Sequence, residues 1–285
     1  MRKRDKTKAR RDKAGSPATA GRPRAVEVRP FPPSRRLVIA ALRAGRRRMA
    51  AMHSLVDLDV TLVRKRIAAS AEPVSFTAFV VAAVARAAAA HPQVHAYRNW
   101  RGRLVQHHHV DVNTLVEVMT DQGPFAVPHV LHDADVRDVQ DLTAELRAVK
   151  RDHTTTGAGR LLDRFGTAAC RVPGLLPTMY AALGRSVRLR QSTGTVAVTA
   201  VGMFGAGGGF GVAPPSLMPL QVVVGGVSER PRAVAGRIAV RDVLDLTLTF
   251  DHNVIDGAPA ARFVTELRRL IENAEGVPGP PEDPP

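Results

Sequence analysis

Residues 251–258, DHNVIDGA, combine a histidine, an aspartate four positions later and a glycine. A histidine titrates near neutral pH, so His252 can take a proton from a thiol or hydroxyl and return it later. Asp256 can fix the geometry of such a site, directly or through a cation. Gly257 can adopt backbone angles that are closed to other residues. The segment is therefore a candidate for acid–base chemistry. The alternative is that His252 is a loop histidine with a purely structural role.

Two regular elements are predicted to hold this segment in place. Residues 244–250 alternate apolar and polar side chains, which is typical of a half-buried strand. A helix is predicted after the segment, with Pro259 in its first turn. Its apolar face is formed by Phe263, Val264, Leu267, Leu270 and Ile271. A tight connection between a strand and a helix is a rigid support for reactive side chains.

Four blocks of the sequence resemble one known family. Residues 251–263, DHNVIDGAPAARF, resemble the DHRVxDGAxAARF signature of the 2-oxo acid dehydrogenase acyltransferases, the E2 catalytic domain. Residues 194–205, GTVAVTAVGMFG, resemble its GTFTISNLGMFG block. Residues 75–92 are similar to its SFTAFLVKAVARALKEHP helix, and residues 121–128 to its DGLVVPV strand. The blocks follow the family's order and cover most of residues 37–275.

The resemblance implies a fold and an assembly. The wider superfamily includes chloramphenicol acetyltransferase, so the expected architecture is an α/β two-layer sandwich with a mixed β-sheet and helices packed on one side. The catalytic domain is expected at residues 34–277. The family also implies a homotrimer or a larger trimer-based assembly, with active sites at subunit interfaces. Lipoyl-bearing proteins and dehydrogenases are the partner proteins that it suggests.

The resemblance also implies a mechanism for the candidate residues. His252 is the expected general base on a thiol of CoA or dihydrolipoamide, and the thiolate attacks an acyl thioester. Thr199 stands where relatives mostly carry a serine whose hydroxyl stabilises the oxyanion. Asp256 is expected to hold the site together rather than to take a proton. Asn253 replaces the family's arginine, which removes a positive charge beside the base.

Two readings of the function follow from these residues. The first is an acyltransferase that uses CoA or acyl-CoA as a substrate and holds no metal. The second is a trimeric scaffold or regulatory protein that has kept the fold without the catalysis. The stretch before residue 34 is too short for a lipoyl domain or a subunit-binding domain, so a freestanding E2-type catalytic domain with no lipoyl attachment site is expected.

Composition places the excess charge at one end of the chain. Of a net charge of +15, residues 1–36 contribute +10, from thirteen Lys/Arg and three Asp/Glu. Residues 1–33 are predicted to be disordered, and residues 278–285 to form a Pro-rich tail. Basic tails can bind nucleic acid, but no aromatic residue or fold motif accompanies this one, so nucleic-acid binding is not favoured.

Other features of the sequence predict the cellular compartment. Cys170 is the only cysteine, so no disulfide can form within the chain. The sequence contains no apolar run of the length that a membrane span needs, and no secretory signal core. Arginine greatly outnumbers lysine outside the tail, which suggests a bacterial source. A cytoplasmic protein is predicted.

Residues 157–191 depart from the family, which has a much shorter connection there. The segment is basic and apolar, with six arginines against the single acid Asp163. Four roles are open for it: a lid over the site, a contact with a membrane surface, attraction of the phosphates of a CoA-type substrate, or packing against a neighbouring subunit.

Two further motifs are read as structural. Residues 107–109 are three histidines on a predicted strand, 104–112, where neighbours point to opposite faces, so at most two could share a metal. Residues 205–211 are glycine-rich, but a dinucleotide fingerprint needs a helix next, and Pro214-Pro215 follow instead. They are predicted to form a flexible connection to a buried strand at 220–224.

The remaining predicted elements frame the core. They are a strand at 54–60, a helix from Thr61, a buried helix that Ser75 caps and Pro92 ends, a strand at 115–119 and a helix at 138–152.

Overall fold

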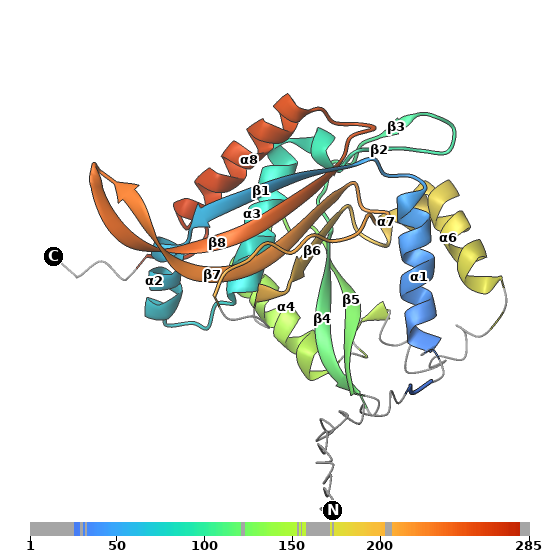
Figure 1. The fold of residues 1–285 in the computed structure, drawn as a ribbon, viewed down its shortest axis with the longest axis horizontal. Helices are drawn as coiled ribbons and strands as arrows, with labels where there is room; N and C mark the ends of the chain where they lie inside the picture. The colour runs from blue at the N-terminus through green and yellow to red at the C-terminus, as the bar shows by residue number, and fades with distance from the viewer. Residues whose placement is uncertain are drawn as a thin grey trace, which may run out of the picture. The chain divides into compact units, whose positions relative to one another are not determined.

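A six-stranded mixed sheet lies at the centre of the computed structural model (Figure 1). Its strands, in the order β1-β8-β7-β6-β4-β5, are β1 (Ala51–Asp59), β4 (Val112–Thr120), β5 (Gly123–Leu131), β6 (Val196–Ala200), β7 (Leu220–Val234) and β8 (Arg237–Asp251). Strand β6 runs parallel to both of its neighbours, and the other pairs are antiparallel. A separate hairpin contains β2 (Tyr97–Arg98) and β3 (Leu104–Val105).

The structure describes residues 26–28, 31, 33–120, 123–152, 154, 156–157, 172, 174–202 and 207–279. Residues 32–285 form one compact unit, distinct from residues 1–31. The tail predicted at residues 1–33 falls almost entirely outside the described part, as does most of the tail predicted at 278–285.

Several of the described helices cover one face of this sheet. The helices are α1 (Pro33–Arg46), α2 (Thr61–Ala69), α3 (Phe76–Ala90), α4 (Val139–Arg151), α6 (Leu175–Arg185), α7 (Val187–Gln191) and α8 (Gly257–Glu272), with a short 3-10 helix at Pro92–His95. Helix α3 lies between α4 and α8. Helix α3 contacts β6, α4 contacts β4, and α8 contacts β1. The predicted mixed sheet with helices packed on one side is therefore confirmed.

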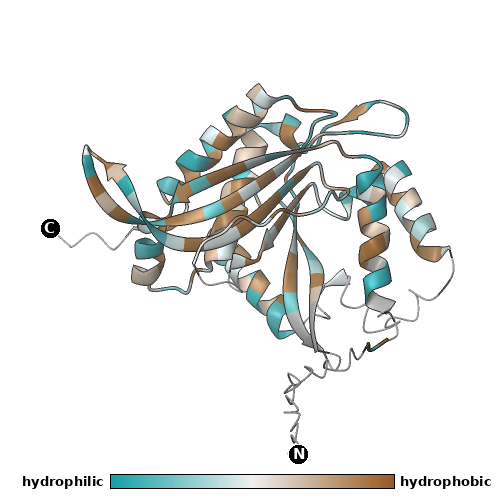
Figure 2. Cartoon of the chain, in the orientation of Figure 1, coloured by the Kyte–Doolittle hydropathy of each residue, from teal (hydrophilic) through white to brown (hydrophobic). Residues whose placement is uncertain are grey.

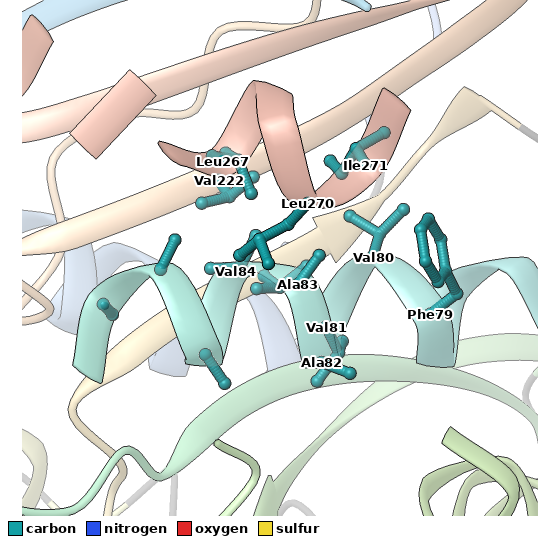
Figure 3. Packing of buried hydrophobic residues seen from close by; sticks show 14 of the residues in the cluster. Phe79, Val80, Val81, Ala82, Ala83, Val84, Val222, Leu267, Leu270 and Ile271 are labelled. Carbon is teal, nitrogen blue, oxygen red and sulfur yellow. The ribbon is translucent and has the colours of Figure 1, made fainter. Parts of the chain in front are cut away.

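Helix α3 is the centre of the hydrophobic core. Ten of its fifteen residues are buried, as expected for a helix that is apolar nearly all round. The Ser75 hydroxyl caps it by accepting a hydrogen bond from the Ala78 amide at 3.4 Å, and Pro92 follows its end, both as predicted. Its Val80 and Val84 lie close to Leu270 and Ile271 of α8 (Figure 3). Along α8, polar residues alternate with this apolar stripe (Figure 2).

Strand β8 differs from its prediction. The polar side chains of Asp245, Thr247 and Thr249 were expected to face solvent, but all three are fully buried. The reason is that the glycine-rich connection lies against this part of the sheet. The Gly209 amide donates to Asp245 at 2.6 Å, and a Cβ added to Gly225 of β7 would overlap the Gly209 carbonyl. Here glycine is needed for close backbone approach, so the described part of the connection, residues 207–219, does not behave as a free linker.

Two other predicted elements need correction, and one helix was not predicted. The strand predicted at 104–112 is confined to β3, and β4 begins only at Val112, so residues 107–109 lie in a loop. The strand at 115–119 is the middle of the longer β4. Helix α1 was not predicted; it packs on α6, which lies in the segment 157–191. Among the described helices, none combines the length and the apolar character that crossing a membrane requires.

Candidate active site

His252 lies in a turn that hydrogen bonds hold in place from both sides. The Asp251 amide donates to the Pro219 carbonyl at 3.0 Å, and the His252 amide donates to the Ala50 carbonyl at 2.7 Å. The Asp251 carboxylate accepts from the Ala50 amide at 3.1 Å and from the Asn253 side chain at 2.7 Å. The backbone that carries His252 is therefore fixed between β8, α8 and the start of β1.

The side chain of Asn253 has a structural role that was not predicted from the sequence. Its Nδ2 donates to the carbonyl of Arg48 at 3.0 Å as well as to Asp251. An asparagine amide can donate two hydrogen bonds at once, and here it uses both to join the turn to the α1–β1 connection. The neutral Asn253 side chain therefore links the His252 turn directly to the backbone of residue 48.

Asp256 and Gly257 are less constrained than expected. The His252 Nδ1 lies 3.8 Å from the Asp256 Oδ1, too far for a hydrogen bond, and the two side chains are 50% and 87% exposed. Gly257 begins α8, and its φ is outside the left-handed region. A Cβ there would meet nothing within 4 Å in this chain. The prediction that Gly257 supplies an unusual backbone angle is therefore wrong.

Thr199 lies on β6, away from His252 of the same chain. Thr199 is paired with Val223, and Val223 with Thr247, which precedes His252 by five residues. The separation is about 17 Å along the strand and about 10 Å across two strand spacings. Thr199 is partly exposed, and its hydroxyl makes no hydrogen bond to the described residues. One chain does not bring the two predicted catalytic groups together.

A basic groove beside the His252 turn was not predicted. It has a volume of about 620 Å³, and its walls come from residues 46–50, from residues 98–100 and 102 of the β2–β3 hairpin, and from Asp251 and Asn253. Its lining includes Arg46, Arg47, Arg48 and Arg98. The sequence shows three consecutive arginines, but only the fold places Arg98 and the hairpin opposite them.

Arg190 of α7 lines a small neighbouring pocket that shares Arg48, Arg98 and Asp251 with this groove. It is buried, its guanidinium carbon lies 3.4 Å from the ring centre of Tyr97, and it donates to the Leu217 carbonyl. Burial is the main cause that lowers the pKa of Arg190 to about 10, and the charge of Arg48 lowers it too. This part of the segment 157–191 thus packs within its own chain, beside the loop that binds the Asp251 turn; residues 158–171 and 173 lie outside the described part.

A buried cluster of aromatic and histidine rings lies next to Arg190. His95 is 1% exposed, and neither of its ring nitrogens has a hydrogen-bond partner among the residues that the structure describes. The ring centres of His95 and Tyr97 lie 6.5 Å and 5.9 Å from that of His107. Burial, and then the charges of His107 and His109, lower the pKa of His95 to about 4. Within the described residues, no three His, Cys, Asp or Glu side chains are arranged to hold a metal ion.

The low pKa of His95 predicts that the fold weakens in mild acid. Its usual pKa of 6.5 in the unfolded chain lies above the folded value of about 4, so the unfolded chain binds the proton more tightly. Stability is then lost as pH falls from about 6.5 towards 4, by about 2 kcal/mol at pH 5. Urea unfolding at about pH 7.5 and about pH 5 measures the loss.

His95→Leu is the matched variant for this experiment. In this variant the free energy of unfolding should differ much less between the two pH values. Part of the difference should persist, because burial also lowers the pKa of His107. An unchanged pH dependence in His95→Leu would show that other groups cause it.

Comparison with known proteins places these features in a family. The sequence matches the family model of the 2-oxoacid dehydrogenases acyltransferase (catalytic domain) over residues 23–158 and 181–277. Residues 159–180 are unmatched and lie inside the segment 157–191 that departs from the family's pattern.

Two relatives in sequence are lipoamide acyltransferase components of branched-chain alpha-keto acid dehydrogenase complexes. The Pseudomonas aeruginosa protein is 36% identical over 93 residues, covering 32% of this chain and 21% of that protein. The Bacillus subtilis protein is 25% identical over 285 residues, covering 92% and 59%. The chain thus spans about a fifth to three fifths of the length of these relatives.

Solved structures agree in fold. The dihydrolipoamide acetyltransferase of Azotobacter vinelandii superposes with a TM-score of 0.66 at 18% identity, covering 89% of this chain and 94% of that one. A truncated catalytic core of the 2-oxoacid dehydrogenase multienzyme complex from Thermoplasma acidophilum gives 0.62 at 20% identity, covering 88% and 100%. Because the family model matches most of this chain, the chain belongs to the family of 2-oxoacid dehydrogenase acyltransferase catalytic domains.

Proposed function

We propose that this chain transfers an acyl group between CoA and a thiol of the dihydrolipoamide type. The observation that carries the proposal is the His252 turn, which is held rigidly at the family's histidine motif. In the proposed reaction His252 takes the proton of the attacking thiol. The thiolate adds to the carbonyl carbon of the acyl thioester, and the tetrahedral oxyanion accepts a hydrogen bond from Thr199. Collapse expels the second thiolate, which takes the proton back from His252.

One structural neighbour supports the choice of residues. The Azotobacter vinelandii enzyme is described through the roles of a serine, a histidine and an asparagine in its catalytic mechanism. In that enzyme the histidine and the asparagine are four positions apart, as are His252 and Asp256. Its serine precedes its histidine by 52 positions, and Thr199 precedes His252 by 53. A threonine hydroxyl keeps the hydrogen-bond donor that an oxyanion needs.

The separation of the two groups in one chain supports an oligomeric site. Thr199 and His252 of one chain are too far apart to act on one substrate molecule. In the proposed site each therefore faces its counterpart on another copy. A closed homotrimer, with three equivalent interfaces, meets this requirement. Another structural neighbour is the cubic core of a pyruvate dehydrogenase multienzyme complex. Lipoyl-bearing and dehydrogenase partner proteins, and a cytoplasmic location, belong to the same proposal.

Mixing two inactive variants tests the shared site. His252→Ala and Thr199→Val should each be nearly inactive alone, since removal of an oxyanion donor costs about 10²–10³ in rate. Trimers refolded from an equal mixture should recover about a quarter of wild-type activity, because that fraction of interfaces combines two intact residues. Thr199→Ser is the control that keeps the hydroxyl and should stay active. Absence of recovery in well-folded mixed trimers would contradict a site shared between copies.

A non-catalytic scaffold is the second candidate. The specific observation in its favour is the loose relation of His252 to Asp256, whose carboxylate is 87% exposed and 3.8 Å away. A scaffold would form the oligomer without turning over any acyl-CoA. The activity of the wild-type protein in the mixing experiment therefore decides between the two candidates.

A further inference from the structure

Helices α1 and α6 lie side by side, apart from the helices that cover the sheet, and carry a strong positive charge (Figure 1). Residues 33–50 and 174–191 together contain nine arginines and no aspartate or glutamate. Within the described part of the chain, five exposed members of this set, all outside the walls of the basic groove, form no salt bridge: Arg35, Arg36, Arg43, Arg185 and Arg188. An anionic partner would therefore meet several free guanidinium groups.

On α1, three of these arginines surround one exposed isoleucine. Ile39 is 37% exposed, and it lies three or four positions from Arg35, Arg36 and Arg43. Residues at these spacings are neighbours on one face of a helix. A different side of α1 is packed, because a Cβ added to Gly45 would overlap the backbone of residue 215. The outward face of α1 thus combines an apolar side chain with three cations.

The outward face of α6 is apolar. Leu175, Met179 and Ala182 follow each other at spacings of four and three residues, and all three are exposed, the first two by 43% and 36%. The opposite side of α6 is packed, since a Cβ added to Gly184 would overlap the guanidinium of Arg48. A surface helix normally turns its apolar stripe towards the core. An apolar stripe that faces outward is typical of an interaction site.

Both helices are held in place before any partner binds. The Ser186 hydroxyl caps α7 by accepting a hydrogen bond from the Leu189 amide at 3.3 Å, directly after α6 ends. Arg190 of α7 is buried against the ring of Tyr97. We call the exposed residues of the two helices the α1–α6 surface; they are Arg35, Arg36, Ile39, Arg43, Leu175 and Met179. Figure 2 shows apolar and hydrophilic residues interspersed along both helices.

The chemistry of the α1–α6 surface fits a lipid bilayer better than a second copy of the chain or a nucleic acid. A second copy docking through the same surface would bring like charges together. Surfaces that bind single-stranded nucleic acid add aromatic rings that stack on bases, whereas the apolar side chains exposed here are aliphatic. An anionic bilayer offers phosphates to the arginines and, just below them, an apolar layer to the aliphatic side chains.

We infer that the α1–α6 surface binds the anionic face of a lipid bilayer. The arginines contact the lipid phosphates, and the stripe of Leu175 and Met179 enters the boundary between headgroups and acyl chains. The long arginine stems lie along the apolar layer while their guanidinium groups stay at the phosphates. The binding is peripheral and does not depend on the proposed acyl transfer, so it holds for an acyltransferase and for a scaffold alike.

Cosedimentation of the full-length protein with lipid vesicles tests the inference. Vesicles of phosphatidylcholine mixed with phosphatidylglycerol should bind the protein, pure phosphatidylcholine vesicles much less, and rising salt should weaken the binding. Leu175→Ser/Met179→Ser should lower the partition coefficient at least about tenfold, because two apolar side chains no longer leave water. Arg35→Gln/Arg36→Gln should lower it about 25-fold, a factor of about five for each arginine.

Matched controls separate the α1–α6 surface from general charge and exposure. Val136→Ser changes an apolar residue that is 78% exposed in the turn before α4 and should leave the partition coefficient unchanged. Arg147→Gln/Arg151→Gln removes the same charge from the exposed side of α4 and should have little effect. Every variant keeps the basic residues 1–31, so differences between variants report on the helices. Thermal unfolding should stay near wild type, because all the altered residues are exposed.

Three results would overturn the assignment. One is vesicle binding that is equal in the wild type and in both α1–α6 variants, which would assign it to residues 1–31. Another is dissociation of the oligomer in Leu175→Ser/Met179→Ser, measured by sedimentation velocity, which would show that a second copy covers the stripe. The third is duplex DNA or polyglutamate that binds as tightly as the vesicles and depends on Arg35 and Arg36 alone.

Discussion

His252→Ala is expected to lower kcat/KM for acyl transfer by about 10²–10⁴, the usual contribution of a positioned general base. Without the imidazole, the attacking thiol must lose its proton to water. The turn itself should persist, because its hydrogen bonds come from the His252 backbone and from Asp251 and Asn253. The measurement is turnover of a panel of acyl-CoAs with dihydrolipoamide and other small thiols as acceptors.

The control for this loss is a histidine elsewhere on the surface. His108→Ala removes an exposed imidazole from the loop before β4 and should retain wild-type activity. Thermal unfolding of both variants shows whether the fold is intact. Substantial turnover in folded His252→Ala would remove the histidine from the mechanism. Absence of turnover and of acyl-CoA binding in the wild-type oligomer would favour the scaffold instead.

Arg230→Ala is expected to destabilise the fold by about 3–5 kcal/mol, since it leaves a buried carboxylate without its counter-ion. Asp245 is fully buried, and its Oδ2 accepts from Arg230 at 2.5 Å and from the Gly209 amide at 2.6 Å. Within the described part of the chain its Oδ1 has no hydrogen-bond partner, so Arg230 is the main group there that compensates the charge. Urea unfolding near neutral pH measures the change in free energy.

An exposed ion pair provides the comparison. Arg64 lies 3.3 Å from Asp242, with 52% of its own side chain exposed, and Arg64→Ala should cost less than about 1 kcal/mol. The double variant Arg230→Ala/Asp245→Val should recover part of the loss, because it removes the unpaired charge together with its partner. Equal losses for Arg230→Ala and Arg64→Ala would show that the Asp245 charge is compensated in another way.

Local sequence signals were sufficient wherever a single element decided the outcome. The apolar run of α3, the cap at Ser75 and the stop at Pro92 act within one helix, so they predicted that helix well. The apolar stripe of α8 and the strand before it placed His252 in a connection between strand and helix. Together with the four family-like blocks, these signals predicted the mixed sheet and its helical layer.

Features that depend on distant parts of the chain required the tertiary structure. Alternation along residues 244–250 predicted a half-buried strand, because nothing local shows that a glycine-rich connection covers Asp245 from 36 positions away. Helix α1 was missed because its packing partner α6 is more than a hundred residues further on. The basic groove likewise depends on the β2–β3 hairpin lying beside Arg46 and Arg47.

The sequence by itself predicted the type of chemistry proposed for this chain, through a histidine and an aspartate four positions apart in a family-like motif. Only the tertiary structure decided how those residues are arranged. It ties Asn253 to the α1–β1 connection, leaves Asp256 exposed, and separates Thr199 from His252 across two strands of one sheet. The physical reason is that spacing fixes which side chains neighbour each other along one strand or helix. The register between strands fixes which of them can meet across the fold.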